Sequence, residues 1–190
     1  MNMIDRVKKI LLQPKQEWEV ISGETTTTAE LYKNYIILLA AIGPVASIIG
    51  LSIVGVSMPF GGATFRVPII TAVGSAVVHY ILSLVGVYIL ALIIDMLAPT
   101  FSGEKNMDQA LKLSAYSYTA GWIAGIFVIL PVLSILGILG LYGLYLLYTG
   151  IPVLMKAPEA KSLGYTAAVC VAAIILFAVM SWLPRAFISY

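Results

Sequence analysis

The side chains best suited to chemistry form one narrow polar stripe on an otherwise apolar segment. Ser75, His79 and Ser83 are spaced i, i+4 and i+8, so they share one face of a helix. An imidazole changes its charge near neutral pH, and a polar stripe inside a membrane faces other helices or water. Two interpretations follow: a proton-sensitive or solute-contacting site, or a neutral histidine that holds helices together through a hydrogen bond to a tyrosine or a carbonyl.

A single carboxylate lies further along the same apolar segment. Asp95 comes sixteen residues after His79, which turns it about 160° around a helix, so the two do not form a dyad. It lies within a turn of Pro99, at the expected end of the helix. We expect a structural role for Asp95, either paired with Lys105 or Lys112 or solvated, because carboxylates at helix ends are less costly than central ones.

Tyrosine hydroxyls supply the other polar groups of the candidate intramembrane site. The tyrosines are Tyr116, Tyr142, Tyr145 and Tyr148. The last three recur every third residue, which leaves them on one broad helical face. They either line a cavity or form hydrogen bonds between helices.

Glycines at short intervals predict close contacts between helices. They are Gly121, Gly125, Gly137, Gly140 and Gly143. Small residues let helix backbones approach each other, so packing inside the chain explains them, and dimerisation is the alternative.

The sequence holds no recognisable catalytic set. It contains no HExxH, no phosphate-binding glycine loop and no GxSxG, and its one histidine and one cysteine lie on different predicted helices. We therefore expect no enzyme activity, no metal and no cofactor. A net charge of +2 is too small to indicate a nucleic-acid partner.

These residues belong to a chain that composition places in a membrane. The mean hydropathy is +1.00, and the forty residues Tyr116–Met155 carry no charged residue and no histidine. A helix of that length would be about 60 Å long against a hydrocarbon core of about 30 Å, which predicts a hairpin of two spans with its turn near Pro131–Gly137. The predicted fold is an all-α integral membrane bundle of five transmembrane helices over residues 28–190. The expected spans are 34–58, 68–98, 116–133, 136–155 and 165–183.

The first 27 residues are expected to form a separate cytoplasmic segment with a basic amphipathic helix that ends at Pro14. One interpretation places this helix on an anionic leaflet, which it contacts through Arg6, Lys8 and Lys9. The other packs it against the cytoplasmic ends of the spans.

Charge asymmetry predicts the orientation. With five spans, nine of the eleven lysines and arginines lie on the side of the N-terminus, and only Arg66 and Arg185 lie on the other. The positive-inside rule then predicts a cytoplasmic N-terminus and an outer C-terminus, most simply in a bacterial cytoplasmic membrane.

Three stretches carry a family resemblance. They are Phe101–Gly103, the pair Ala115-Tyr116, and LYGLYLLYTGIPVL from Leu141 to Leu154. With them the chain resembles the bacterial branch of the Yip (Ypt-interacting protein) family of membrane proteins. The resemblance implies five spans and a cytoplasmic N-terminus. Eukaryotic relatives are linked to Rab-type GTPases and vesicle trafficking, but their Asp-Leu-Tyr-Gly-Pro string is absent, and Ala120 stands where family members commonly have proline.

Together these features predict a non-enzymatic membrane protein of the Yip type that organises the membrane or binds partners. Its expected partners are membrane lipids, proteins on the cytoplasmic face and a second copy of the chain. The alternative is a small transporter, channel or lipid translocator that uses the polar stripe and the tyrosines.

Overall fold

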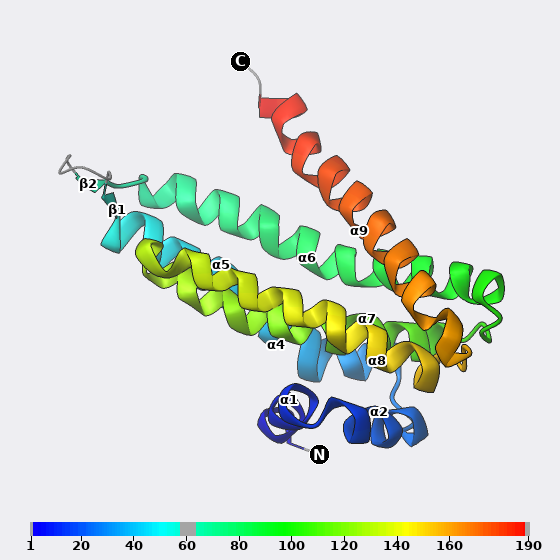
Figure 1. Ribbon diagram of the computed structural model, residues 1–190. Helices are drawn as coiled ribbons and strands as arrows, with labels where there is room; N and C mark the ends of the chain where they lie inside the picture. The colour runs from blue at the N-terminus through cyan, green and yellow to red at the C-terminus, as the bar shows by residue number, and fades with distance from the viewer. Residues whose placement is uncertain (1, 58–63, 189–190) are drawn as a thin grey trace. The chain divides into compact units, whose positions relative to one another are not determined.

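The computed structural model describes residues 2–57 and 64–188, and they form helices with one short pair of strands (Figure 1). The predicted all-α class is confirmed. Most of the connection between the first two predicted spans lies outside the described residues.

Two short helices open the chain. In α1 (Met3–Leu12) the side chain of Asn2 accepts a hydrogen bond from the amide of Ile4 and caps the helix. Pro14 takes the first position of α2 (Pro14–Gly23), where a missing N–H costs little. The side chains that these two helices bury are Arg6, Ile10, Pro14, Glu17, Trp18 and Ile21.

The first long helix runs from Thr28 to Val54 and departs from α geometry at several points. Pro44 has no N–H for the carbonyl of Ala40, and the helix is broken at Ala41. The helix ends at Val54, four residues before the predicted end of the first span, because Gly55 adopts a φ of 83°. Its segments are α3 (Thr28–Leu31), the π-helical η1 (Tyr32–Ile36), α4 (Ile37–Ala40), α5 (Ile42–Ile48) and the π-helical η2 (Ile49–Val54).

A small antiparallel pair follows, in which β1 (Val56–Ser57) is paired with β2 (Thr64–Phe65). The second long helix, α6 (Ile69–Leu97), lies within one residue of the predicted span 68–98 at each end. It continues as the 3-10 turn η3 (Ala98–Phe101), and a left-handed residue at Ser102 ends it.

The uncharged segment forms a helical hairpin. Its first arm is α7 (Met107–Ala124) with η4 (Gly125–Ile129), and its second is η5 (Pro131–Leu141) with α8 (Tyr142–Leu154). The arms turn at Leu130, whose backbone is extended, and η4 packs against η5 (Figure 1). The second arm begins at residue 131, where the sequence predicted 136, because proline suits the first position of a helix.

The last helix, α9 (Glu159–Ile188), begins six residues before the predicted start at 165. Pro158 precedes its first residue, and Glu159 places a carboxylate in the first turn, where the helix dipole favours negative charge.

The contacts divide the chain into two units. The first unit contains the chain up to Thr28, Val85–Ser117 and the chain from Leu144 onward, and the second contains Ala29–Leu84 and Tyr118–Gly143. The division into a cytoplasmic N-terminal segment (1–27) and a membrane domain (28–190) stays a prediction, but the N-terminal segment does not form a unit of its own. The N-terminal helices belong to the same unit as the beginning of α7 and most of α8, because they bury charged and aromatic side chains there.

Three helices in the described part of the chain are long and apolar enough to cross a membrane: Thr28–Val54, Ile69–Phe101 and Val132–Leu154. The five spans predicted from the sequence remain a prediction, since neither α7 nor α9 is among these three.

Several glycines mark close approaches between backbones in the second unit. A Cβ on Gly140 would lie 3.2 Å from the Cα of Gly121, and a Cβ on Gly125 would lie 3.1 Å from the Cα of Gly43. Gly121 and Gly125, which are spaced i, i+4, therefore contact different elements. A Cβ on Gly137 would meet nothing within 4 Å.

The tightest of these approaches predicts a mutational effect. A Cβ on Gly50 would lie 2.1 Å from the backbone oxygen of Val128. We expect Gly50→Ala to lower the free energy of unfolding by about 1–3 kcal/mol, because a backbone must move to admit the methyl group. Unfolding by SDS in mixed micelles measures the effect. Gly43→Ala is the matched control, since its Cβ meets nothing within 4 Å; equal stability of the two variants would contradict the prediction.

Candidate functional site: a buried charged clamp on the N-terminal helices

Arg6 joins the two N-terminal helices through buried ion pairs. We use the name clamp for these ion pairs together with the contacts of Trp18 and Lys112 that hold the same helices. Its guanidinium donates to the Glu17 carboxylate over 2.5 Å and also to the carboxylate of Glu24. The side chains of Arg6 and Glu17 are only 6% and 4% exposed. The expected contact of Arg6 with an anionic leaflet is therefore wrong, because its charge is buried and paired inside the protein.

A signal for this cluster is present in the sequence. Arg6 and Ile10 are spaced i, i+4 on α1, and Glu17 and Ile21 have the same spacing on α2. Each charge therefore shares a helical face with a fully buried isoleucine. This spacing is a signal for a buried pair, but the pattern alone does not say whether the two charged faces meet.

Aromatic rings complete the surroundings of Arg6. The guanidinium carbon lies 5.6 Å from the centre of the Tyr116 ring, a distance typical of a cation–π contact. Trp18 meets the same ring edge-on, at 6.2 Å between centroids. Tyr116, which was predicted to belong to a polar intramembrane site, thus packs against the N-terminal helices.

Trp18 anchors α2 to α8. Its side chain is fully buried, and its indole N–H donates to the hydroxyl of Thr149 over 3.1 Å. Gly150 leaves the space for the ring, because a Cβ there would lie 2.7 Å from the indole and 2.5 Å from Leu113. Gly150 was absent from the predicted packing glycines, since its partner is 132 positions earlier in the chain and no local pattern reveals it.

The beginning of α7 holds the end of α2. Lys112 donates to the backbone carbonyls of Ile21 (3.2 Å) and Glu24 (2.5 Å), and Gln109 donates to the carbonyl of Ser22 (2.9 Å). Carbonyls at a helix C-terminus have no partner within the helix, and they attract cations. Lys112 therefore caps α2, and the expected ion pair between Lys112 and Asp95 is not formed.

This contact predicts a pH dependence of stability. Burial lowers the pKa of Lys112 below its ordinary value of 10.5, although Glu24 and Asp108 raise it in part. Between the folded and unfolded pKa values the unfolded chain binds more protons, so the free energy of unfolding should rise with pH through this window up to 10.5. At pH values below both pKa values Lys112 is charged in the folded and the unfolded chain, so the full cost of burying the charge then lowers the free energy of unfolding.

Unfolding measured at a series of pH values checks this dependence. Lys112→Met should flatten the rise, whereas Lys15→Met, which changes an exposed lysine of α2, should leave it unchanged. A slope that is the same in both variants would show that another group titrates there.

Asp95 lies near the end of α6 without a cationic partner in the described part of the chain. Its side chain is half-buried, and its Oδ1 atom is buried and accepts no hydrogen bond there. Lys105 is exposed and forms no ion pair with it among the described residues. The pairing that the sequence suggested is therefore not formed.

The polar stripe of α6 lies mostly on an exposed face. Ser75 and His79 are exposed, and each bonds to the helix itself: Ser75 donates to the carbonyl of Ala72, and Nδ1 of His79 lies 2.8 Å from the carbonyl oxygen of Ser75. Since a carbonyl can only accept, Nδ1 carries a proton. Ser83 differs, because it accepts a hydrogen bond from the indole of Trp122 (3.3 Å).

The remaining tyrosines of the candidate site differ in their exposure and belong to different units. Tyr145 and Tyr148 are 42% and 41% exposed, and Tyr142 is half-buried. Asp95, Tyr116, Tyr145 and Tyr148 belong to the first unit, whereas Ser75, His79, Ser83 and Tyr142 belong to the second.

Other tyrosines provide hydrogen bonds between helices in the second unit. Tyr35 shares a 2.7 Å hydrogen bond with Thr119, Tyr32 donates to the carbonyl of Leu84, and Tyr80 donates to the carbonyl of Ile37. These tyrosines come from the first long helix and α6, and the two alternatives for the hairpin tyrosines, cavity lining or hydrogen bonds between helices, stay open.

Comparisons with known proteins agree with the motifs in the sequence. A family model of the Yip1 domain matches residues 8–180. Inner membrane protein YohC of Escherichia coli strain K12 is 25% identical over 119 residues, which cover 62% of this chain and 60% of YohC. The protein of the same name from an O6:H1 strain of Escherichia coli matches to the same extent, so the similarity spans less than two-thirds of these relatives. No solved structure matches.

The family match includes the last part of α1, all of α2 and most of α9. It therefore contains Glu17, Trp18 and Lys112 of the clamp, together with the apolar helices. Because the match covers most of the chain, this protein belongs to the Yip1 domain family of membrane proteins.

Proposed function

We propose that this protein is a non-enzymatic, five-span protein of a bacterial inner membrane, whose N-terminal helices present a lipid- and partner-binding surface on the cytoplasmic side. The observation that carries the proposal is the buried clamp at Arg6. The clamp holds one face of α1 and α2 against α7 and α8 of the first unit. The opposite face of the two helices therefore has a defined position.

The outer face of the N-terminal helices combines apolar and basic side chains. Ile4, Leu12 and Val20 are 54%, 78% and 50% exposed. The exposed lysines of the same helices are Lys8, Lys9 and Lys15. Ile4, Lys8 and Leu12 recur every fourth residue, so they form one stripe along α1.

Such a surface suits the interface of an anionic leaflet. Apolar side chains enter the headgroup region, and each lysine near an anionic surface contributes about 1 kcal/mol. Lys8 and Lys9 keep the role that the sequence proposed for them, and Lys15 joins them. The same exposed side chains can contact a protein partner at the membrane surface.

The contacts of the ionisable side chains support a non-enzymatic role. The only histidine of the chain is exposed and bonds to a carbonyl of its own helix. The buried ionisable groups of the clamp contact one another and backbone carbonyls, as structural groups do.

The topology is tested with reporters fused to the C-terminus. Five spans with a cytoplasmic N-terminus predict that a fusion to alkaline phosphatase is active. They also predict that a fusion to green fluorescent protein does not fluoresce. An even number of spans would reverse both signals. A fusion after Lys105, in the loop before α7, is the internal control and should give the cytoplasmic pattern, because two spans precede it.

The lipid contact is tested with a fluorophore on the outer face. Leu12→Cys in a Cys170→Ala background carries an environment-sensitive dye, and the protein is reconstituted with increasing fractions of phosphatidylglycerol. We expect the dye to enter an apolar environment as the anionic fraction rises, and Lys8→Gln with Lys9→Gln to weaken this response. Lys105→Gln, in the loop before α7, should not weaken it.

A dye that stays in water at every lipid composition would contradict the leaflet contact. Capture of partners in native lipid then tests the protein-binding form of the proposal. A capture that retrieves only lipids would count against that form.

A further inference from the structure

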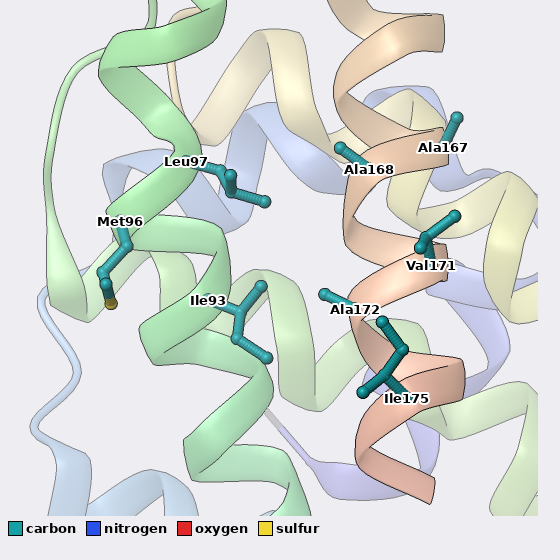
Figure 2. Close-up of a pocket in the computed structure, with 8 residues that line it drawn as sticks. All are labelled: Ile93, Met96, Leu97, Ala167, Ala168, Val171, Ala172 and Ile175. Atoms are coloured by element: carbon teal, nitrogen blue, oxygen red, sulfur yellow. The ribbon is translucent and has the colours of Figure 1, made fainter. Parts of the chain in front are cut away.

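An apolar groove of about 520 Å³ lies between the end of α6 and the first half of α9 (Figure 2). Ile93 and Leu97 of α6 face Ala168 and Ala172 of α9 across it, and Ile175 closes its far end. The alanines create the space, because their side chains are too short to reach the opposite helix. The volume lies within the range of about 300–1,000 Å³ that is typical of small-molecule sites.

Two aromatic rings hold the helices together at one end of the groove. Phe101 and Tyr165 are stacked, with 4.9 Å between centroids and 7° between ring planes. Tyr165 is fully buried, and its hydroxyl donates to the carbonyl of Ile94. These contacts hold the beginning of α9 against the end of α6, beside the groove.

A cation lies beyond the same end of the groove. The ammonium of Lys161 donates to the hydroxyl of Ser102 over 2.7 Å, and both residues are exposed. Lys161 precedes Ala168 by seven residues and Ile175 by fourteen. It therefore shares their helical face and lies about 10 Å further along the axis.

Neither of the two nearby glutamates, Glu104 and Glu159, forms an ion pair with Lys161 among the described residues. Glu104 pairs with Lys156 over 2.7 Å. Glu159 precedes Lys161 by two residues, which turns it to another side of α9. In the described part of the chain, the hydrogen-bonding partner of Lys161 is an uncharged hydroxyl.

We propose that this groove binds an anionic glycerophospholipid, with one acyl chain between α6 and α9 and the phosphate bound by Lys161 and Ser102. An acyl chain matches the apolar walls, and a phosphate oxygen accepts hydrogen bonds from an ammonium and a hydroxyl. A helix of a second copy could fill the apolar part, but it would leave the cation unmatched. The site lies apart from α1 and α2, so it stands or fails independently of their proposed role.

Native mass spectrometry of the full-length protein tests the site. The protein is released from detergent that contains equal amounts of phosphatidylglycerol and phosphatidylcholine, and the bound lipids are counted. We expect about a fivefold preference for phosphatidylglycerol, the effect of one lysine at an anionic headgroup. Lys161→Gln should abolish this preference and retain phosphatidylcholine binding, whereas Ala172→Phe should reduce the retention of both lipids.

Two matched variants control for nonspecific effects. Lys105→Gln removes an exposed lysine outside the site, and Leu163→Phe adds a ring to an exposed position of α9 that does not line the groove. Both should retain the preference, and melting temperatures confirm that every variant is folded. An unchanged preference in Lys161→Gln, or unchanged retention in Ala172→Phe, would overturn the proposal. A dimer that dissociates in Ala172→Phe without any loss of lipid would assign the groove to a second copy.

Discussion

Replacing Arg6 with alanine should lower the free energy of unfolding by about 3–5 kcal/mol, because it leaves the buried carboxylate of Glu17 without its counter-charge. The two side chains form a 2.5 Å ion pair and are almost completely buried. Glu24 loses the same partner, and the cation–π contact to Tyr116 also disappears. Unfolding by SDS in mixed micelles, followed by tryptophan fluorescence, measures the change.

The matched control for Arg6 is Lys8→Ala, which removes an exposed cation two residues away on the same helix. We expect that variant to remain within about 0.5 kcal/mol of the parent protein. A second variant separates the charge from the packing. Arg6→Met combined with Glu17→Met removes both charges and should recover much of the loss, since apolar replacements of buried ion pairs are often tolerated. Equal stability of Arg6→Ala and Lys8→Ala would show that the N-terminal helices are not clamped.

Trp18→Ala should destabilise the protein by about 3–5 kcal/mol, the usual effect of removing a fully buried tryptophan side chain. The ring fills the space left by Gly150, meets Tyr116 edge-on and donates to Thr149. Circular dichroism follows the SDS titration in this case, because the substitution changes the tryptophan signal.

Smaller changes at the same position divide the effect into parts. Trp18→Phe keeps most of the apolar volume but loses the N–H, and we expect a cost of about 1 kcal/mol from the lost hydrogen bond to Thr149. Val20→Ala, at a half-exposed position of the same helix, is the control. If Trp18→Ala were no more disruptive than Val20→Ala, α2 would not be anchored through its tryptophan.

The helical hairpin shows what a local pattern can predict. Forty residues without a charge are too long for one crossing, and proline, serine and glycine predict a turn near Pro131–Gly137. The structure places the turn at Leu130, immediately before that range, and Pro131–Leu141 is already helical. The predicted helix ends are less accurate where the conformation of a single residue ends the helix. Gly55 is an example, because its positive φ ends the first long helix.

The polar groups show where local patterns fail. The sequence placed Ser75 and His79 on one face of a helix, but periodicity does not say what that face meets. In the structure Ser75 and His79 are exposed and bond to carbonyls of α6, while Ser83 contacts Trp122. Packing between segments far apart in the chain decides which polar group faces a partner.

By itself, the sequence determined the all-α class, the membrane environment and the family, because hydrophobicity, helix length and short motifs are properties of neighbouring residues. Only the tertiary structure decided that Arg6 is a buried clamp and not a leaflet contact. Its partners Glu17, Glu24 and Tyr116 lie 11, 18 and 110 positions away. A charge on a short amphipathic helix belongs to the surface or to the core according to what packs against it, and that is settled only when distant helices meet.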